Sequence, residues 1–188
     1  MPSDPNTDVL REVYGRVIYT HKAHEKDREF KSRSAFQMKL ANIALTALTF
    51  GGLVGTATLD NTKLLWASLI LATLTLGFTV FQLSFDPAKD AARHRIAAKS
   101  LLAIRERYVN LLADIANGLP VDDVQIQRDE LQAELNEIYQ QAPDTSSRAF
   151  SAAKKALKLK GEMTFSTEEL DHFLPASLKS TPVTDSPT

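Results

Sequence analysis

Residues 40–85 decide the fold, and their sequence is LANIALTALTFGGLVGTATL (40–59), DNTK (60–63) and LLWASLILATLTLGFTVFQLSF (64–85). Neither apolar run contains Asp, Glu, Lys, Arg or His. A helix rises about 1.5 Å per residue, so each run reaches about 30 Å, the thickness of the hydrocarbon core of a bilayer. The sequence therefore predicts a transmembrane hairpin with two spans and a very short turn. The alternative, a buried hairpin in a soluble bundle, would have to explain why neither helix has a water-facing side.

Outside this hairpin the chain is rich in Lys, Arg, Glu, Ala and Leu and has few strand-like runs, which predicts an all-α membrane protein. The net charge of −1 argues against a general nucleic-acid binder. The absence of cysteine excludes disulfides, thiol catalysis and cysteine-based metal centres. We expect no cofactor and no direct nucleic-acid partner.

Positive charges flank the hairpin on both sides, whereas the turn offers only Lys63. The flanking residues are Lys22, Lys26, Arg28, Lys31, Arg33 and Lys39 before the first span and Lys89, Arg93, Arg95, Lys99, Arg105 and Arg107 after the second. Positive residues close to spans stay on the cytoplasmic side, so both termini are expected in the cytoplasm. Because a long charged segment precedes the first span, no cleavable signal peptide is expected.

The rest of the chain divides around the hairpin into four segments. These are a polar lead-in (1–7), an N-terminal cytoplasmic helix (8–39), a cytoplasmic helical region (86–174) and a disordered tail (175–188). The N-terminal helix should continue straight into the first span. Asp86-Pro87 offers an N-cap followed by proline at the first helical position, so a new helix should start there, at the membrane surface.

Turn residues divide the cytoplasmic region further. The helix that begins after Asp86 should end near Asn117, because Gly118-Leu119-Pro120 follows it. Further helices are expected over about 122–141 and 146–159, and Ser166 has the spacing of a capping box with Glu169.

The first of these helices carries an apolar stripe at alternating three- and four-residue steps, which is typical of a coiled coil. We call it the seam, and it consists of Leu101, Ile104, Tyr108, Leu111 and Ile115. A single chain is expected to leave the seam poorly covered. We therefore predict that it is the cytoplasmic interface of a homo-oligomer.

Each span also carries a polar stripe along one side, and Leu53 lies in line with the stripe of the first span. The pore-lining candidates are Asn42, Thr46, Thr49, Leu53, Thr56, Ser68, Thr75, Thr79 and Gln82. If the stripes meet around a central axis, they could line a narrow water path in which Leu53 is an apolar constriction that gates by dewetting. The alternative is that the hydroxyls bond to carbonyls of their own helix and carry no function.

The opposite side of the first span consists of small residues, which let helix backbones approach closely in lipid. These helix-packing candidates are Ala44, Ala47, Gly51 and Gly55, the last two in a G-x-x-x-G pair. We expect this face to close the hairpin.

His21 and His24 lie three residues apart and could share one helix face near Glu25 and Asp27. A metal site is conceivable there, but basic residues crowd the same turns and no third ligand has convincing spacing. We interpret this segment as a solvated helix at the membrane surface, and we treat His94 in the same way. No nucleotide-binding or hydrolase motif is present, so no enzyme is predicted.

The stretches that point to a known family lie on both sides of the hairpin. They are Val13-Tyr14-Gly15-Arg16, Thr20-His21-Lys22-Ala23-His24, His94-Arg95-Ile96-Ala97-Ala98, Arg105-Glu106-Arg107-Tyr108 and Tyr139-Gln140-Gln141-Ala142-Pro143. With the short-turned hairpin between them, their order over about residues 10–175 resembles the SMODS- and SLOG-associating two-transmembrane effector domain (SLATT) of bacteria.

The resemblance implies an oligomeric pore-forming or membrane-disrupting effector of a bacterial antiviral defence, in which an infected cell undergoes abortive infection. It also implies a place in the inner membrane and a signal from a nucleotide second messenger or a neighbour-encoded sensor protein. The alternative is a non-conducting membrane anchor or scaffold whose cytoplasmic helices recruit a partner protein. Polar substitutions around Leu53 distinguish the two, because they should change the activity of a pore and leave that of a scaffold intact.

Overall fold

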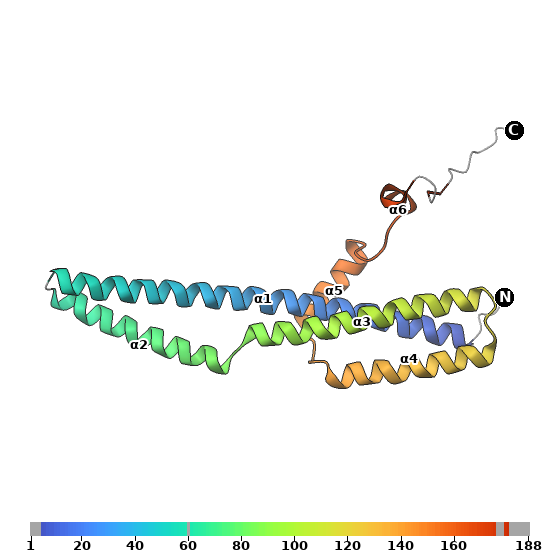
Figure 1. The fold of residues 1–188 in the computed structure, drawn as a ribbon, viewed down its shortest axis with the longest axis horizontal. Helices are drawn as coiled ribbons and strands as arrows, with labels where there is room; N and C mark the ends of the chain where they lie inside the picture. The colour runs from blue at the N-terminus through green and yellow to red at the C-terminus, as the bar shows by residue number, and fades with distance from the viewer. Residues whose placement is uncertain (1–4, 60, 176–178, 181–188) are drawn as a thin grey trace.

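The computed structural model describes residues 5–59, 61–175 and 179–180. The described part of the chain is helical, with no strand, and it forms an elongated molecule whose longest helix runs from end to end (Figure 1). The all-α prediction is thus confirmed. Most of the predicted polar lead-in (1–4) and most of the predicted disordered tail (176–178 and 181–188) lie outside the described residues.

Helix α1 (Pro5–Leu59) is a single helix of 55 residues, about 80 Å long. It confirms the expectation that the N-terminal helix continues into the first span, and it begins three residues before the predicted start at Asp8. The first half of α1 is charged and the last third is apolar, so one continuous helix connects the charged part of the molecule with the hairpin.

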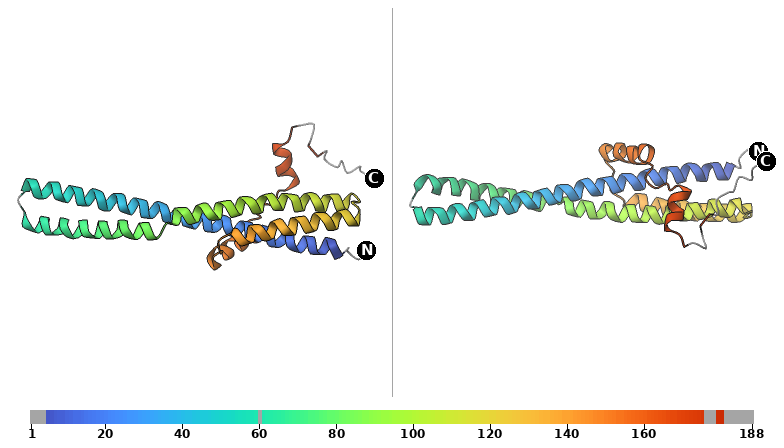
Figure 2. Two further views of the ribbon diagram at one scale, coloured as in Figure 1. Left: turned by 60° about the horizontal axis from the view of Figure 1, so that its bottom comes forward. Right: turned by 90° about the horizontal axis from the view of Figure 1, so that it is seen from above.

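The turn after α1 is tightened by a side-chain cap. Asn61 accepts hydrogen bonds from the backbone N–H groups of Lys63 (3.0 Å) and Leu64 (3.3 Å), which starts α2 (Thr62–Ser84) three residues after Leu59. Helix α2 then returns along α1, and the two lie side by side in all views (Figure 2).

The predicted break at Asp86-Pro87 is confirmed. The carboxylate of Asp86 accepts hydrogen bonds at 3.0 Å from the N–H groups of Ala88 and Lys89, and Pro87 is the first residue of α3 (Pro87–Ala116). Proline has no N–H to donate and its ring disfavours helical geometry at the preceding residue, so α2 and α3 cannot be one continuous helix.

The outer surface of the hairpin is apolar and bare. Side chains along both helices are largely exposed, among them Leu48, Phe50, Trp66, Leu76 and Leu83, the last with 82% of its surface exposed. Both helices are long and apolar enough to cross a membrane, and none of the apolar window of α1 is buried. A soluble bundle would bury these side chains against protein, so the soluble alternative does not fit.

The half of the molecule outside the hairpin is a three-helix bundle of α1, α3 and α4 (Val121–Gln141). Its core contains Leu10, Val13, Val17, Leu101, Ile104, Tyr108, Leu111, Val124, Leu131 and Leu135. The first four residues of the seam are therefore buried within one chain, and Ile115 packs against them. The expectation that a single chain leaves the seam uncovered is wrong, because α1 and α4 cover it from two sides.

Two shorter helices complete the fold. Helix α5 (Ser147–Leu159) packs across α1, and α6 (Thr167–Phe173) stands apart from the bundle (Figure 1). The positive φ angles of Gly118 (96°) and Gly161 (63°) mark the ends of α3 and α5, where L-residues with a Cβ would be strained. The predicted helix boundaries of the cytoplasmic region agree with the structure to within one residue or so.

Candidate functional site

The polar stripes of the two spans face one another inside the hairpin. Thr49 Oγ1 lies 3.1 Å from Thr75 Oγ1, and Thr79 Oγ1 donates to Asn42 Oδ1 at 3.3 Å. Nearer the start of α3, Gln82 Nε2 donates to the backbone carbonyl of Met38 at 3.2 Å. We call these three contacts the polar ladder. In lipid they provide partners for the side-chain amides of Asn42 and Gln82.

The hydroxyls of the ladder have more acceptors than protons. Thr49 Oγ1 lies 2.8 Å from the carbonyl of Leu45, and Thr75 Oγ1 lies 2.8 Å from the carbonyl of Leu71. Each hydroxyl has one hydrogen, so at most two of the three contacts around this pair are hydrogen bonds at one time. The contact between the helices is therefore exchangeable for a contact within each helix.

The remaining pore-lining candidates do not join the ladder. Thr46, Thr56 and Ser68 donate to carbonyls of their own helices, at 2.8, 2.7 and 2.9 Å. Leu53 is exposed at the edge of the hairpin. These are the bonds within one helix that we expect if the hydroxyls of Thr46, Thr56 and Ser68 carry no function.

Most of the small-residue face of α1 does not pack against α2, contrary to expectation. Ala44, Ala47 and Gly51 are exposed, and a Cβ on Gly51 would have nothing within 4 Å. The close approach is at Gly52, where a Cβ would lie 2.4 Å from Ser68 Oγ, and at Gly55, where it would lie 3.0 Å from a methyl group of Leu64. The expectation that this face closes the hairpin is wrong for Ala44, Ala47 and Gly51, which point away from α2.

Directly below the spans, a cluster of polar side chains is buried between α1, α3 and the start of α5. It comprises His21, Lys22, His24, Asp27 and His94, each less than a tenth exposed. The interpretation of these histidines as solvated is wrong. They continue the three- and four-residue spacing of Leu10, Val13 and Val17, and small residues opposite them, Ala91, Ala97 and Ala98, let α3 approach. That spacing is the signal that could have identified them.

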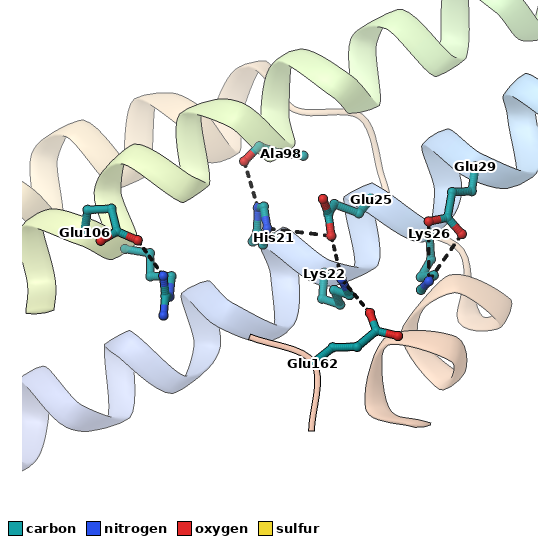
Figure 3. A network of polar contacts seen from close by, with 9 residues as sticks. His21, Lys22, Glu25, Lys26, Glu29, Ala98, Glu106 and Glu162 are labelled. Carbon is teal, nitrogen blue, oxygen red and sulfur yellow. Dashed lines mark hydrogen bonds and ion pairs between the residues drawn. The ribbon is translucent and has the colours of Figure 1, made fainter. Parts of the chain in front are cut away.

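The histidines of this buried polar cluster are paired. His24 Nδ1 lies 3.0 Å from His94 Nδ1, so one ring donates its N–H and the other accepts with a lone pair. His21 Nδ1 lies 2.8 Å from the carbonyl of Ala98, which makes this nitrogen the donor (Figure 3). Burial, and then the neighbouring His94, lower the pKa of His24 from 6.5 to about 4. Burial also lowers the pKa of His94.

Asp27 ties α5 to α1. Its two carboxylate oxygens accept hydrogen bonds from the backbone N–H and the hydroxyl of Ser146, both at 2.7 Å. Ser146 is the N-cap of α5 and accepts in turn from the N–H of Ala149. A buried negative charge at a helix N-terminus is also favoured by the helix dipole.

Lys22 makes a second connection to the same segment. Its ammonium lies 2.7 Å from Glu25 and 2.8 Å from Glu162, which follows α5 (Figure 3). Burial would lower the pKa of Lys22, but these two carboxylates raise it. Nearer the membrane, Lys31 and Asp90 join α1 to α3 at 3.0 Å. The described residues contain no group of three or more His, Cys, Asp or Glu side chains placed to hold a metal ion.

An apolar helical hairpin that continues into a charged helical bundle defines a two-span membrane protein with a folded extramembrane domain. The comparison with protein families agrees with that class. The chain belongs to the family described as SMODS and SLOG-associating 2TM effector domain family 4, whose model matches residues 7–169. The resemblance noted in the sequence is thereby confirmed.

The family assigns a role at the membrane, since its members are two-transmembrane effector domains of conflict systems. Neither the curated proteins nor the solved structures contain a match to this chain.

Proposed function

We propose that this protein is an oligomeric effector that permeabilises the bacterial inner membrane as part of an anti-phage, abortive-infection response. The observation that supports the proposal most is the polar ladder, which places amides and hydroxyls in contact inside a hairpin with an apolar outer surface. The amides of Asn42 and Gln82 are costly to place inside a membrane, which favours a functional role for them.

The ladder is suited to a change of partners. Because the hydroxyls of Thr49 and Thr75 have alternative acceptors within their own helices, separating the helices costs little in unsatisfied groups. In an assembly of several hairpins, the freed side chains face a shared axis and water, and Leu53 is the apolar constriction of the closed path.

One surface of α1 supports assembly in the membrane, and the flanking charges support an orientation. The face of Ala44, Ala47 and Gly51 points away from α2 and is small enough for close packing against a second copy. The basic residues on both sides of the hairpin favour cytoplasmic termini, so that the cytoplasmic bundle would receive the signal.

The proposed effector is not an enzyme, and its output is a change in assembly. A nucleotide second messenger or a neighbour-encoded sensor protein would bind the bundle and favour the conducting assembly. To convert an almost fully closed population into an almost fully open one, the signal must bind the open assembly more favourably than the closed one by about 5 kcal/mol.

The test is leakage of a dye from liposomes that contain the purified protein, and ion leakage from cells that express it. The matched control is Leu48→Asp with Leu76→Asp, which puts a charge inside each span and should prevent insertion. Leu53→Ser should increase leakage, since it removes the apolar constriction. Absence of leakage, with candidate cyclic nucleotides and neighbour-encoded proteins added, would contradict the proposal.

Exposed aromatic side chains on α5, on α6 and in the segment between them favour a second candidate function. Phe150, Phe165 and Phe173 are all more than half exposed and lie outside the hairpin. A non-conducting scaffold that recruits a partner protein would use such a surface. Its activity would survive Leu53→Ser unchanged, whereas that of a pore would not.

A further inference from the structure

The cytoplasmic domain contains a cavity of about 410 Å³ where α1, α4 and α5 meet, apart from the polar ladder and the buried polar cluster. Its wall includes Gly15, Arg16 and Tyr19 from α1, Gln132 and Tyr139 from α4, and Phe150 from α5. The volume lies within the range of small-molecule sites, near its lower end. Three helices from distant parts of the chain thus contribute to one concave surface.

Gly15 keeps this space open. Glycine inside a helix is unfavourable because it loses the most backbone freedom on folding, so it usually marks a close approach. No such approach exists here, since a Cβ on Gly15 would have nothing within 4 Å. Any larger side chain at this position would occupy the cavity.

Three aromatic side chains line the cavity. The rings of Tyr19 and Phe150 lie with their centroids 6.1 Å apart and their planes inclined by 32°, and Tyr139 completes the wall from α4. Tyr139 and Phe150 are also substantially exposed, which is unusual for aromatic side chains that only fill a core. Aromatic surfaces of this kind contact the face or edge of a planar ring.

Arg16 supplies the single positive charge of the cavity wall. Within the described part of the chain, no carboxylate lies at ion-pair distance from its guanidinium. A guanidinium presents several N–H donors in a planar fork that matches phosphate and carboxylate groups. The amide of Gln132 adds a polar group that can donate and accept.

We infer that this cavity binds a small ligand that combines a planar ring with one anionic group. The ring packs among Tyr19, Tyr139 and Phe150, and the anionic group pairs with Arg16. Two chemical sources offer this combination, namely nucleoside monophosphates and aromatic carboxylates. The inference does not require that the hairpin permeabilises a membrane.

The test is isothermal titration calorimetry on the full-length protein in phosphatidylcholine nanodiscs. The nucleotide probes are AMP, GMP, CMP and UMP, and the carboxylate probes are 4-hydroxyphenylacetate and indole-3-acetate. Adenosine and inorganic phosphate test the ring and the anion separately. We expect one probe class to bind, and each half-ligand to bind about tenfold more weakly or worse, because neither uses both parts of the site.

Two variants locate the binding. Gly15→Leu should abolish it by filling the cavity while favouring the helix, and Arg16→Gln should weaken it about tenfold by removing the charge. Arg11→Gln, on the exposed side of α1 outside the cavity, is the matched control and should bind as the unaltered protein does. If no probe binds at millimolar concentration, or if Gly15→Leu binds normally, the inference is overturned. Equal binding of adenosine and AMP would overturn the role of Arg16. No step of this measurement depends on leakage.

Discussion

The hairpin and the three-helix bundle bury opposite kinds of side chain, although α1 runs through both. In the hairpin the apolar side chains are outside and the polar ladder is inside. In the bundle, apolar side chains form the core, and His24, Asp27 and His94 are buried beside it. Apolar side chains can face lipid at no cost, whereas they are unfavourable in water. Helix α1 therefore exposes its apolar side chains in the hairpin and buries them in the bundle.

The largest difference between the regions should appear on truncation of a leucine. Leu101→Ala in the bundle, where the side chain is 0% exposed, should lower the free energy of unfolding by about 2–5 kcal/mol, because it removes core contacts and leaves a cavity. Leu48→Ala, on the lipid-facing surface of α1, should change it by less than about 0.5 kcal/mol. Denaturant unfolding of the bundle in mild detergent, followed by circular dichroism, measures both. Equal effects of the two substitutions on the free energy of unfolding would mean that the bundle is not stabilised by its own core.

The next largest effect is the dependence of the bundle on pH. The pKa of His24 is lowered from 6.5 to about 4 in the folded state, so the folded protein binds fewer protons than the unfolded chain. Its stability should be constant above pH 7 and should fall as the pH drops from about 6.5 towards 4, by about 2 kcal/mol at pH 5. The charged and titratable groups around the pair are His21, Asp27 and Lys31 from α1 and Asp90 and Arg93 from α3.

Denaturant unfolding at pH 7.5 and pH 5 measures this difference. His24→Leu should reduce the difference in stability between the two pH values, because it removes the buried imidazole whose pKa is lowered. His172→Gln is the matched control, because His172 lies exposed on α6. An unaltered difference in His24→Leu would assign the pH dependence to other groups.

The sequence predicted the hairpin, the long first helix and the break at Asp86-Pro87, because each depends on local composition and capping. It did not predict how α1 and α3 pack. The seam from Leu101 to Ile115 has the same periodicity whether it faces another chain or α1 and α4. Only the three-dimensional arrangement distinguishes the two.

The candidate site was predicted in part, for a similar reason. Asn42, Thr49, Thr75, Thr79 and Gln82 were identified by their polarity within apolar runs, and the structure joins all five in the polar ladder. His24 and His94 were dismissed because charged neighbours surround them in sequence. Arg93 and Arg95 are exposed on either side of the buried His94, whereas Lys22 is itself part of the buried polar cluster. The burial of the two histidines depends on a contact between residues that are 70 positions apart.

A smaller effect should follow from the tie between α5 and α1. Asp27→Asn replaces one acceptor oxygen by an amide that faces a donor, so at least one of the two bonds to Ser146 is lost. We expect α5 to lose about 1–2 kcal/mol of local stability, because the bond to a charged partner is removed. Hydrogen exchange of the amides over Ser147–Leu159 should become about tenfold faster. Asp144→Asn, at an exposed position two residues before Ser146, removes the same charge and should leave the exchange unchanged.

The smallest effect concerns the polar ladder itself. A double-mutant cycle of Thr49→Val and Thr75→Val should give a coupling of only about 0.6 kcal/mol, typical of hydrogen bonds between membrane helices. The reason is that each hydroxyl already has a carbonyl of its own helix as an alternative acceptor. Reversible unfolding in mixed micelles provides the measurement, and Thr46→Val is the control, because Thr46 bonds only within α1 among the described residues. A coupling above about 2 kcal/mol would mean that the ladder fixes the hairpin, and such a hairpin could not open without a large opposing free energy. A small coupling means that the two spans are held mainly by packing at Gly52 and Gly55, so that assembly with other copies could separate the ladder and leave its polar groups free to face water.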